Sequence, residues 1–280
     1  MKKQSWWICV VPLYIFTLLF VLGPMVYMVA VSFATNNPSG YGFRWELTMT
    51  NFLKILDPLY LQCFIQSFKL AFATTGICIL IGYPFGYYMG RLSERGKKIM
   101  MFLIMIPFWT SSLIRIYGWL IILQAKGLFN WVLLAIGLIE EPLKILYSYP
   151  AVLIGMVYAL LPFMILAVYS SVEKMDWSLV EAARDLGASP AKAFWTVTLK
   201  LTLPGLMSGI ILTFVPSMGL FFIADILGGN KIVLVGSLIQ DQLTRGSNWP
   251  FAAALAMVLT IMTTLLIALN RMLLQGKGEE

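Results

Sequence analysis

The sequence of 280 residues contains no histidine and only three cysteines, Cys9, Cys63 and Cys78. Without histidine, the chain cannot build imidazole metal sites, Ser-His or Cys-His nucleophiles, or histidine proton relays. The cysteines lie far apart and show no Cys-x-x-Cys spacing, which argues against zinc, iron–sulfur and thioredoxin-type chemistry. We therefore expect no metal site, and an odd number of cysteines does not indicate a disulfide framework.

Charged residues are also scarce. They make up 12% of the chain, whereas about 25% is usual in a soluble domain. Hydrophobic residues make up 60% and the mean hydropathy is +0.84, which excludes an ordinary water-soluble globule. The net charge is +7. In a membrane protein, such an excess indicates basic cytoplasmic loops before it indicates nucleic-acid binding.

Nucleotide-binding motifs are absent from the sequence. It contains neither a G-x-x-x-x-G-K-[ST] phosphate loop nor a dinucleotide-binding fingerprint after a strand. We therefore expect a chain that is not itself an enzyme and that holds no cofactor. If ATP drives its work, another chain hydrolyses the ATP.

Long apolar runs dominate what is present. Since about 20 apolar residues cross a bilayer as a helix, the runs predict an all-α polytopic membrane protein with six transmembrane helices in a single domain, residues 1–280. A shorter apolar stretch, Leu128–Ile139, is expected to lie in the interface or to pack on the bundle. The first run is too long for a signal peptide and lacks a cleavage site, which predicts a retained signal-anchor helix. The predicted spans are about 7–33, 67–90, 99–123, 151–171, 205–227 and 251–273.

The distribution of lysine and arginine predicts the orientation. With the N-terminus inside, the inner segments hold 12 of these residues and the outer segments hold 7, while Arg115 lies within a span. Cytoplasmic loops carry the excess of positive charge. We therefore expect both termini in the cytoplasm and the long loop 172–203 on the cytoplasmic side.

This loop has the signals of two short helices. Ser178 and Glu181 have the spacing of a capping box, so the first helix should begin at Ser178. Gly187 supplies a left-handed residue that ends it. Ser189-Pro190 then begins a second helix, with serine as the cap and proline at the first helical position, which should run to about Lys200.

The same residues resemble a known motif. Glu181-Ala182-Ala183, followed by Gly187 and Leu203-Pro204, is similar to the EAA motif of permease subunits of bacterial ABC importers. The resemblance implies a cytoplasmic helix–turn–helix coupling loop that docks into the ATPase and transmits its closure to the membrane helices. The sequence departs from the family at Lys200, where a second proline is usual. The coupling residues it implies are Glu181, Ala182, Ala183, Asp185 and Gly187.

Four further strings resemble permease subunits of spermidine/putrescine importers, in particular their first permease subunit. They are Ile55–Tyr60, Ile106–Gly118, Leu160–Met164 and Asn248–Phe251. The resemblance implies a multi-pass protein of the bacterial inner membrane that carries polyamines. The implied partners are a homodimeric cytoplasmic ABC ATPase that holds ATP and Mg, a second homologous permease in a heterodimer, a periplasmic or surface substrate-binding protein, and membrane lipid; no nucleic acid is expected.

Other functions stay open at this point. Permeases of similar pattern carry aminophosphonates or opines. A secondary transporter driven by an ion gradient would need acids in the middle of a span, which the sequence does not offer. A structural membrane protein would not need the capped helix pair of the inner loop.

A polyamine site needs separated carboxylates with aromatic faces between them, because ammonium groups bind favourably over rings. Asp225, near the outer end of the fifth span, is the best-placed acid, although it could equally satisfy backbone groups at a helix end. The aromatic residues could instead pack in the core, face lipid or anchor the interface. Arg115 would repel a cation, so we do not expect it to bind substrate; its long side chain should either snorkel outward or bind carbonyls of a neighbouring helix. The predicted substrate-pathway residues are Asp225, Phe221, Phe222, Trp109, Tyr117, Tyr158 and Asp241.

Proline positions predict breaks in three of the spans. Pro107, Pro162 and Pro216 lie within the third, fourth and fifth spans. Backbone groups freed at these depths must face a cavity or a neighbouring helix, because lipid cannot bond them.

Overall fold

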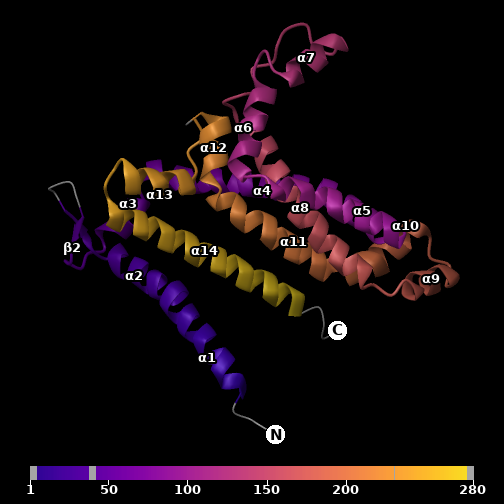
Figure 1. The fold of residues 1–280 in the computed structure, drawn as a ribbon, viewed down its shortest axis with the longest axis horizontal. Coiled ribbons are helices and arrows are strands. Elements are labelled where there is room, and N and C mark those ends of the chain that lie inside the picture. Colours follow the sequence, from indigo (N-terminus) through magenta and orange to yellow (C-terminus); the bar gives the residue numbers. More distant parts are fainter. Residues whose placement is uncertain (1–4, 38–41, 230, 276–280) are drawn as a thin grey trace. The chain divides into compact units, whose positions relative to one another are not determined.

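The structure is a computed structural model that describes residues 5–37, 42–229 and 231–275. Nearly all elements are helices (Figure 1). The chain divides into two compact units, one formed by residues 1–63 and 238–265 and the other by residues 64–237 and 266–280.

Six helical segments of the described chain are long and apolar enough to cross a membrane, which confirms the predicted number. Four of the six lie close to their predicted positions. The third and the fifth differ. The observed segments are Val10–Ser32, Pro58–Gly90, Ser112–Ala135, Tyr149–Glu173, Pro190–Gly219 and Trp249–Met272.

The third apolar segment lies later in the chain than the predicted 99–123. Helix α5 (Glu94–Met105) begins with several charged residues, which lower its hydropathy, and it passes into the 3-10 turn η2 (Ile106–Trp109). The helix restarts as α6 (Ser112–Leu123), and the apolar stretch expected in the interface forms α7 (Leu128–Ala135). Pro107 therefore breaks this region as predicted, because proline lacks the N–H that a continuing helix needs.

The fifth segment also differs from the predicted 205–227. Helix α11 (Leu199–Gly219) ends where Leu220 adopts φ −78° and ψ 60°, and α12 (Phe221–Gly228) is a separate helix. At its start, α11 follows directly on α10 (Pro190–Ala193) and the π turn η3 (Phe194–Thr198). The second loop helix therefore does not stop near Lys200, and one helical segment runs from Pro190 into the span.

Pro162 does not interrupt its helix as predicted, whereas the break predicted near Pro216 is observed four residues later, at Leu220. Pro162 lies inside α8 (Tyr149–Glu173), which continues through it to its end. Pro216 lies inside α11, three residues before its last residue. A proline removes one hydrogen bond and can kink a helix without ending it when neighbouring groups keep the other bonds.

The first unit contains the N-terminal helical segment. Asn51 joins two of its elements, because its Nδ2 donates to the carbonyl oxygens of Ser32 (3.0 Å) and Ala34 (2.8 Å) at the end of α2. These bonds satisfy carbonyls that the end of a helix leaves free. The elements of this unit are α1 (Ser5–Thr17), η1 (Leu18–Leu22), α2 (Gly23–Ser32), β1 (Thr35–Asn36), β2 (Phe43–Arg44), α3 (Thr50–Ile55), the start of α4 (Pro58–Gly90), most of α13 (Val235–Thr244) and most of α14 (Trp249–Gln275).

The second unit is built around α8. On α4, Gly82, Gly86 and Gly90 recur every four residues and therefore form one ridge, which faces α8. A Cβ atom on Gly86 would lie 2.8 Å from the carbonyl oxygen of Ile165 in α8. Small residues at such spacing let membrane helices approach closely and gain van der Waals contact.

Helix α11 approaches α8 in the same way. A Cβ atom on Gly205 would lie 2.3 Å from Cβ of Ser171 and 2.7 Å from the carbonyl oxygen of Ala167. Gly209, one turn later, would meet Sδ of Met164 at 2.6 Å. One glycine ridge from α4 and another from α11 thus pack against α8. Helix α11 lies beside α8 in Figure 1.

We expect Gly86→Ala to destabilise the protein, because the new methyl would overlap a backbone oxygen of α8 that cannot move away alone. Overpacking of this kind costs about 1 to 3 kcal/mol. The midpoint of thermal unfolding in detergent should fall. Gly76→Ala is the matched control on the same helix, since nothing lies within 4 Å of its Cβ position. Equal midpoints for the two variants would contradict the proposed role of the ridge.

Candidate functional site

Two groups of predicted functional residues of the second unit lie toward the two ends of α11. At its first end lies the elbow, which we define as α9 (Ser178–Asp185) and the turn 186–189. At its last end lies α12, which carries Asp225 (Figure 1). Since a helix rises about 1.5 Å per residue, the 21 residues of α11 separate the two regions by about 30 Å.

The elbow begins where the sequence predicts, but its capping group is different. The carboxylate of Asp176, through Oδ1, accepts a hydrogen bond from the backbone N–H of Ser178 at 3.0 Å. The Ser178 side chain does not act as the predicted cap, because Ser178 is the first residue of α9 and the N–H of Glu181 donates instead to the carbonyl oxygen of Trp177 at 3.2 Å. Hydrogen bonds from Ser178 hold the pKa of the Asp176 carboxyl below its usual value.

The turn of the elbow matches its prediction. Gly187 has φ +84°, a left-handed conformation that favours glycine, and the N–H of Ala188 donates to the carbonyl of Ala183 at 3.0 Å. Ser189 caps the following helix, because its Oγ accepts from the N–H of Lys192 at 3.3 Å. Pro190 stands at the first position of that helix.

The outer surface of the elbow is open to the surroundings. Glu181, Ala182 and Asp185 are exposed and Ala183 is half-buried. Leu186, at the end of α9, is 90% exposed. The elbow thus presents acidic, small and apolar groups together on one projecting element.

The base of the elbow is anchored by aromatic contacts. The Trp177 ring lies 6.0 Å from the Tyr87 ring of α4, and Tyr87 in turn lies 5.9 Å from Phe194, which follows α10. The guanidinium of Arg91 lies 5.4 Å from the centre of the Trp177 ring. Such pairs contribute about 0.5 to 1.5 kcal/mol beyond the area they bury. The elbow is therefore attached both to α4 and to the helical segment that becomes α11.

At the other end of α11, Asp225 opens into a hollow of about 480 Å³. Its Oδ1 accepts a hydrogen bond from Oγ of Ser237 at 2.8 Å, which orients the carboxylate. Tyrosine rings and a carboxylate are the groups that bind an ammonium ion in proteins. The hollow is lined by Tyr117, Leu120, Tyr147, Asp225, Ile226, Gly229 and Lys231.

Sequence reasoning missed two of these groups, Tyr147 and Lys231. Tyr147 adopts φ +62°, and its N–H donates to the carbonyl of Leu227 at 2.9 Å. Its ring covers Gly229, where a Cβ atom would lie 2.5 Å from the ring. Tyr147 and Lys231 both lie in connecting segments that contain no recognisable sequence motif. The adjacent glycines Gly228 and Gly229 were the only local signal that another side chain approaches closely here.

Of the seven predicted pathway residues, Asp225 and Tyr117 line this hollow. The other five have neighbours elsewhere. Trp109 is 74% exposed and its ring lies 5.6 Å from Phe102, Tyr158 lies 5.4 Å from Trp119, Phe221 lies 6.3 Å from Phe222, and Oδ1 of Asp241 lies 3.7 Å from Nε of Arg245.

Arg115 closes the break between η2 and α6. Its Nη1 donates to the carbonyl oxygen of Pro107 at 2.6 Å, and its guanidinium lies 5.3 Å from the centre of the Phe108 ring. Carbonyls at the end of a helix carry partial negative charge and have no helical donor. The Pro107 carbonyl also accepts from the N–H of Thr110 at 3.3 Å and from its Oγ1 at 2.9 Å, and Arg115 adds a donor that carries a positive charge.

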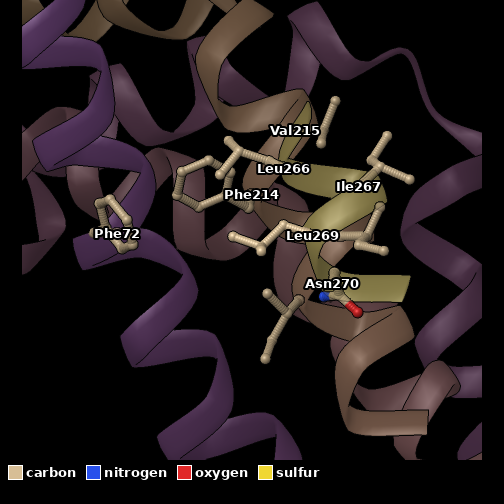
Figure 2. Close-up of a pocket in the computed structure, with 9 residues that line it drawn as sticks. Phe72, Phe214, Val215, Leu266, Ile267, Leu269 and Asn270 are labelled. Carbon is tan, nitrogen blue, oxygen red and sulfur yellow. The ribbon is translucent and has the colours of Figure 1, made fainter. Parts of the chain in front are cut away.

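A separate cavity of about 190 Å³ lies beside α11 (Figure 2). The side chains of Phe72, Phe214 and Leu266 point into it, and Asn270 is its polar group. The Asn270 Oδ1 atom is buried and has no hydrogen-bond partner. None of the described residues that line this cavity is charged, so it is unsuited to a cation. Among the residues that the structure describes, no three His, Cys, Asp or Glu side chains form a metal-binding group.

Comparison with known proteins links these features to one family. The family described as "Binding-protein-dependent transport system inner membrane component" matches residues 82–277. The spermidine/putrescine transport system permease protein PotB of Haemophilus influenzae is 44% identical over 248 residues, which cover 89% of this chain and 86% of that protein. PotB of Escherichia coli is 41% identical over 249 residues, which cover 89% of this chain and 90% of that protein.

Solved structures show the same fold at low sequence identity. A bacterial ABC transporter involved in the import of the acidic polysaccharide alginate contains a chain that superposes with a TM-score of 0.74 at 16% identity. The superposition covers 98% of this chain and 96% of that one. It therefore supports the fold alone.

We expect Arg115→Met to lower the thermal midpoint, because the Pro107 carbonyl would lose its charged donor. A hydrogen bond to a charged group contributes about 1.5 to 3 kcal/mol. Arg115→Lys should retain part of the stabilisation, since lysine keeps the positive charge but lacks the planar set of donors of arginine. Arg95→Met, on an exposed position of α5, is the control. An unchanged midpoint for Arg115→Met would refute the capping role.

Proposed function

Because the chain belongs to the family of binding-protein-dependent transport system inner membrane components, we propose that it is the permease subunit of an ATP-driven importer of polyamines. The observation that carries the proposal is its identity of 41–44% with spermidine/putrescine permeases over 89% of the chain. At this similarity the membrane helices and their connections correspond over nearly the whole length. The Asp225 hollow supports the proposal further, because a carboxylate and tyrosine rings together suit a cationic substrate.

The protein is a multi-pass inner-membrane protein. We place both termini in the cytoplasm, because the lysine and arginine residues favour that orientation. The elbow within loop 172–203 then lies on the cytoplasmic side and the Asp225 hollow on the outer side. A substrate delivered from outside would meet Asp225 first.

The proposed partners follow from this arrangement. The family description names a binding protein, which would deliver the polyamine to the outer side. The sequence contains no phosphate loop, so ATP and Mg would be held by a homodimeric ATPase on the cytoplasmic side. A second related permease would complete the pathway as a heterodimer. This chain would contribute transport without an ATPase site of its own.

Coupling would begin at the elbow. We propose that Glu181, Ala182, Ala183, Asp185 and Gly187 contact the ATPase, since they stand on a projecting element and the small residues permit close approach. A displacement of α9 would act on α4 through Trp177 and Tyr87. It would act on α11 because the helical segment 190–219 has no break between the elbow and the span.

The glycine ridges would then move α8 with its neighbours. Closely packed helices transmit displacement because their contacts leave no space to absorb it. The movement would reach Leu220, where α11 ends, and α12 with Asp225 beyond it. ATP-driven closure at one end could thus change the substrate site about 30 Å away.

Along the pathway, we propose that Asp225 binds a substrate ammonium and that Tyr117 covers its methylene chain. A cation over an aromatic ring gains about 0.5 to 2 kcal/mol. We propose that the other predicted residues contact the substrate elsewhere along the pathway. They are Trp109, Tyr158, Phe221, Phe222 and Asp241.

We expect Glu181→Lys and Gly187→Asp to abolish uptake and co-purification of the ATPase. The first reverses an exposed charge of the docking surface, and the second forces a side chain into a left-handed position at a cost of about 1 to 2 kcal/mol. Gly137→Asp is the control, because Gly137 has φ +70° at the end of α7, outside the elbow. Radiolabelled spermidine uptake by the reconstituted complex measures the effect. Full uptake by both elbow variants would remove the coupling role.

We expect Asp225→Asn to raise the KM for spermidine by about tenfold or more, since a charge-assisted hydrogen bond contributes about 1.5 to 3 kcal/mol. Asp225→Glu should retain part of the affinity. Glu140→Gln, which removes an exposed negative charge outside the hollow, is the control. If Asp225→Asn shows wild-type kinetics with both putrescine and spermidine, Asp225 does not bind substrate.

A further inference from the structure

The hollow of Asp225 contains a charge of the opposite sign, that of Lys231. We propose that Lys231 determines substrate affinity and specificity, because its ammonium competes with the substrate's ammonium for the Asp225 carboxylate. This inference rests on the proposed function. Lys231 would thus be a specificity residue of the pathway.

The backbone brings Lys231 back to the same hollow. Helix α12 ends at Gly228, the following Gly229 turns the chain with a φ of +57°, and the N–H of Lys231 donates to the carbonyl of Gly228 at 3.2 Å. The Tyr147 ring packs against Gly229 and supports this turn. Six residues after Asp225, Lys231 therefore lines the hollow that Asp225 lines.

The two charges share the hollow without neutralising each other. No salt bridge within 4.0 Å involves Lys231 in the part of the chain that the structure describes. The Asp225 carboxylate is held by Ser237 through Oδ1. Lys231 is exposed, so its side chain is free to approach the carboxylate or to turn away from it.

The chemistry of the lysine side chain makes it a suitable competitor. It is an ammonium group on a flexible four-carbon stem. Putrescine, and the longer arm of spermidine, are also ammonium groups on four methylenes. A hollow that accepts this arm of the substrate between Tyr117, Tyr147 and Asp225 therefore also accepts Lys231.

Competition of this kind has two consequences. In the absence of substrate, the positive charge of Lys231 in the same hollow reduces the attraction of Asp225 for other cations. When substrate is present, Lys231 repels its ammonium groups, and the repulsion increases with the number of substrate charges. Lys231 thus weakens the binding of spermidine more than that of putrescine and favours onward release.

The test is the KM for uptake of radiolabelled putrescine and spermidine by the complete reconstituted transporter. We expect Lys231→Gln to lower the KM by about two- to fivefold, the range of an exposed charge interaction, with the larger change for spermidine. Lys231→Arg should stay near the wild type. In an Asp225→Asn background, Lys231→Gln should produce a smaller change, because the carboxylate for which the ammonium competes has been removed.

Lys126→Gln is the matched control, because it removes an exposed lysine of the α6–α7 connection that does not line the hollow. An equal change in KM for Lys126→Gln would show a general effect of surface charge and would overturn the inference. An unchanged or raised KM for Lys231→Gln, while Asp225→Asn still impairs uptake, would overturn it and leave the proposed function intact. If Asp225→Asn leaves uptake unchanged, that result would instead refute the proposed substrate site itself.

Discussion

The close contact of α8 with two glycine ridges is the constraint on which the second unit depends. Gly86 of α4 and Gly205 of α11 stand where any side chain would overlap α8. In lipid, helices gain little from burying apolar groups, so this contact must come from close van der Waals packing. A set of helices joined in this way moves together, which is what the proposed function demands.

The same packing explains how two chemically different regions can belong to one mechanism. The elbow is polar and projecting, whereas the Asp225 hollow combines one carboxylate, one lysine and two tyrosine rings. Helix α11 connects them, since it continues from the segment after the elbow and ends beside α12. The attachment of Trp177 to Tyr87 adds a second connection, through α4. In the proposed mechanism, ATP binding to the partner at the elbow would act on the hollow through these two connections, without a direct contact.

Local signals predicted the elbow well and the hollow poorly. Gly187 and Ser189 act through their own backbone and nearest neighbours, so their roles could be read from spacing. Even there, Ser178 is not the cap of α9, because the Asp176 carboxylate binds the N–H of Ser178 and the N–H of Glu181 donates to the carbonyl oxygen of Trp177. Tyr147 and Lys231 reach Asp225 through chain turns that no periodicity announces. Pro162 was expected to break α8, but the helix continues through it.

The sequence by itself determined the membrane setting, the number of spans, the absence of nucleotide-binding motifs and the elbow, because hydropathy, missing motifs and helix signals are properties of local composition. Only the tertiary structure decided that α11 continues from the segment after the elbow, that Arg115 closes the break at Pro107, and that Lys231 faces the hollow of Asp225. These features depend on contacts between residues distant in the chain. Such contacts arise from packing, which a local pattern does not contain.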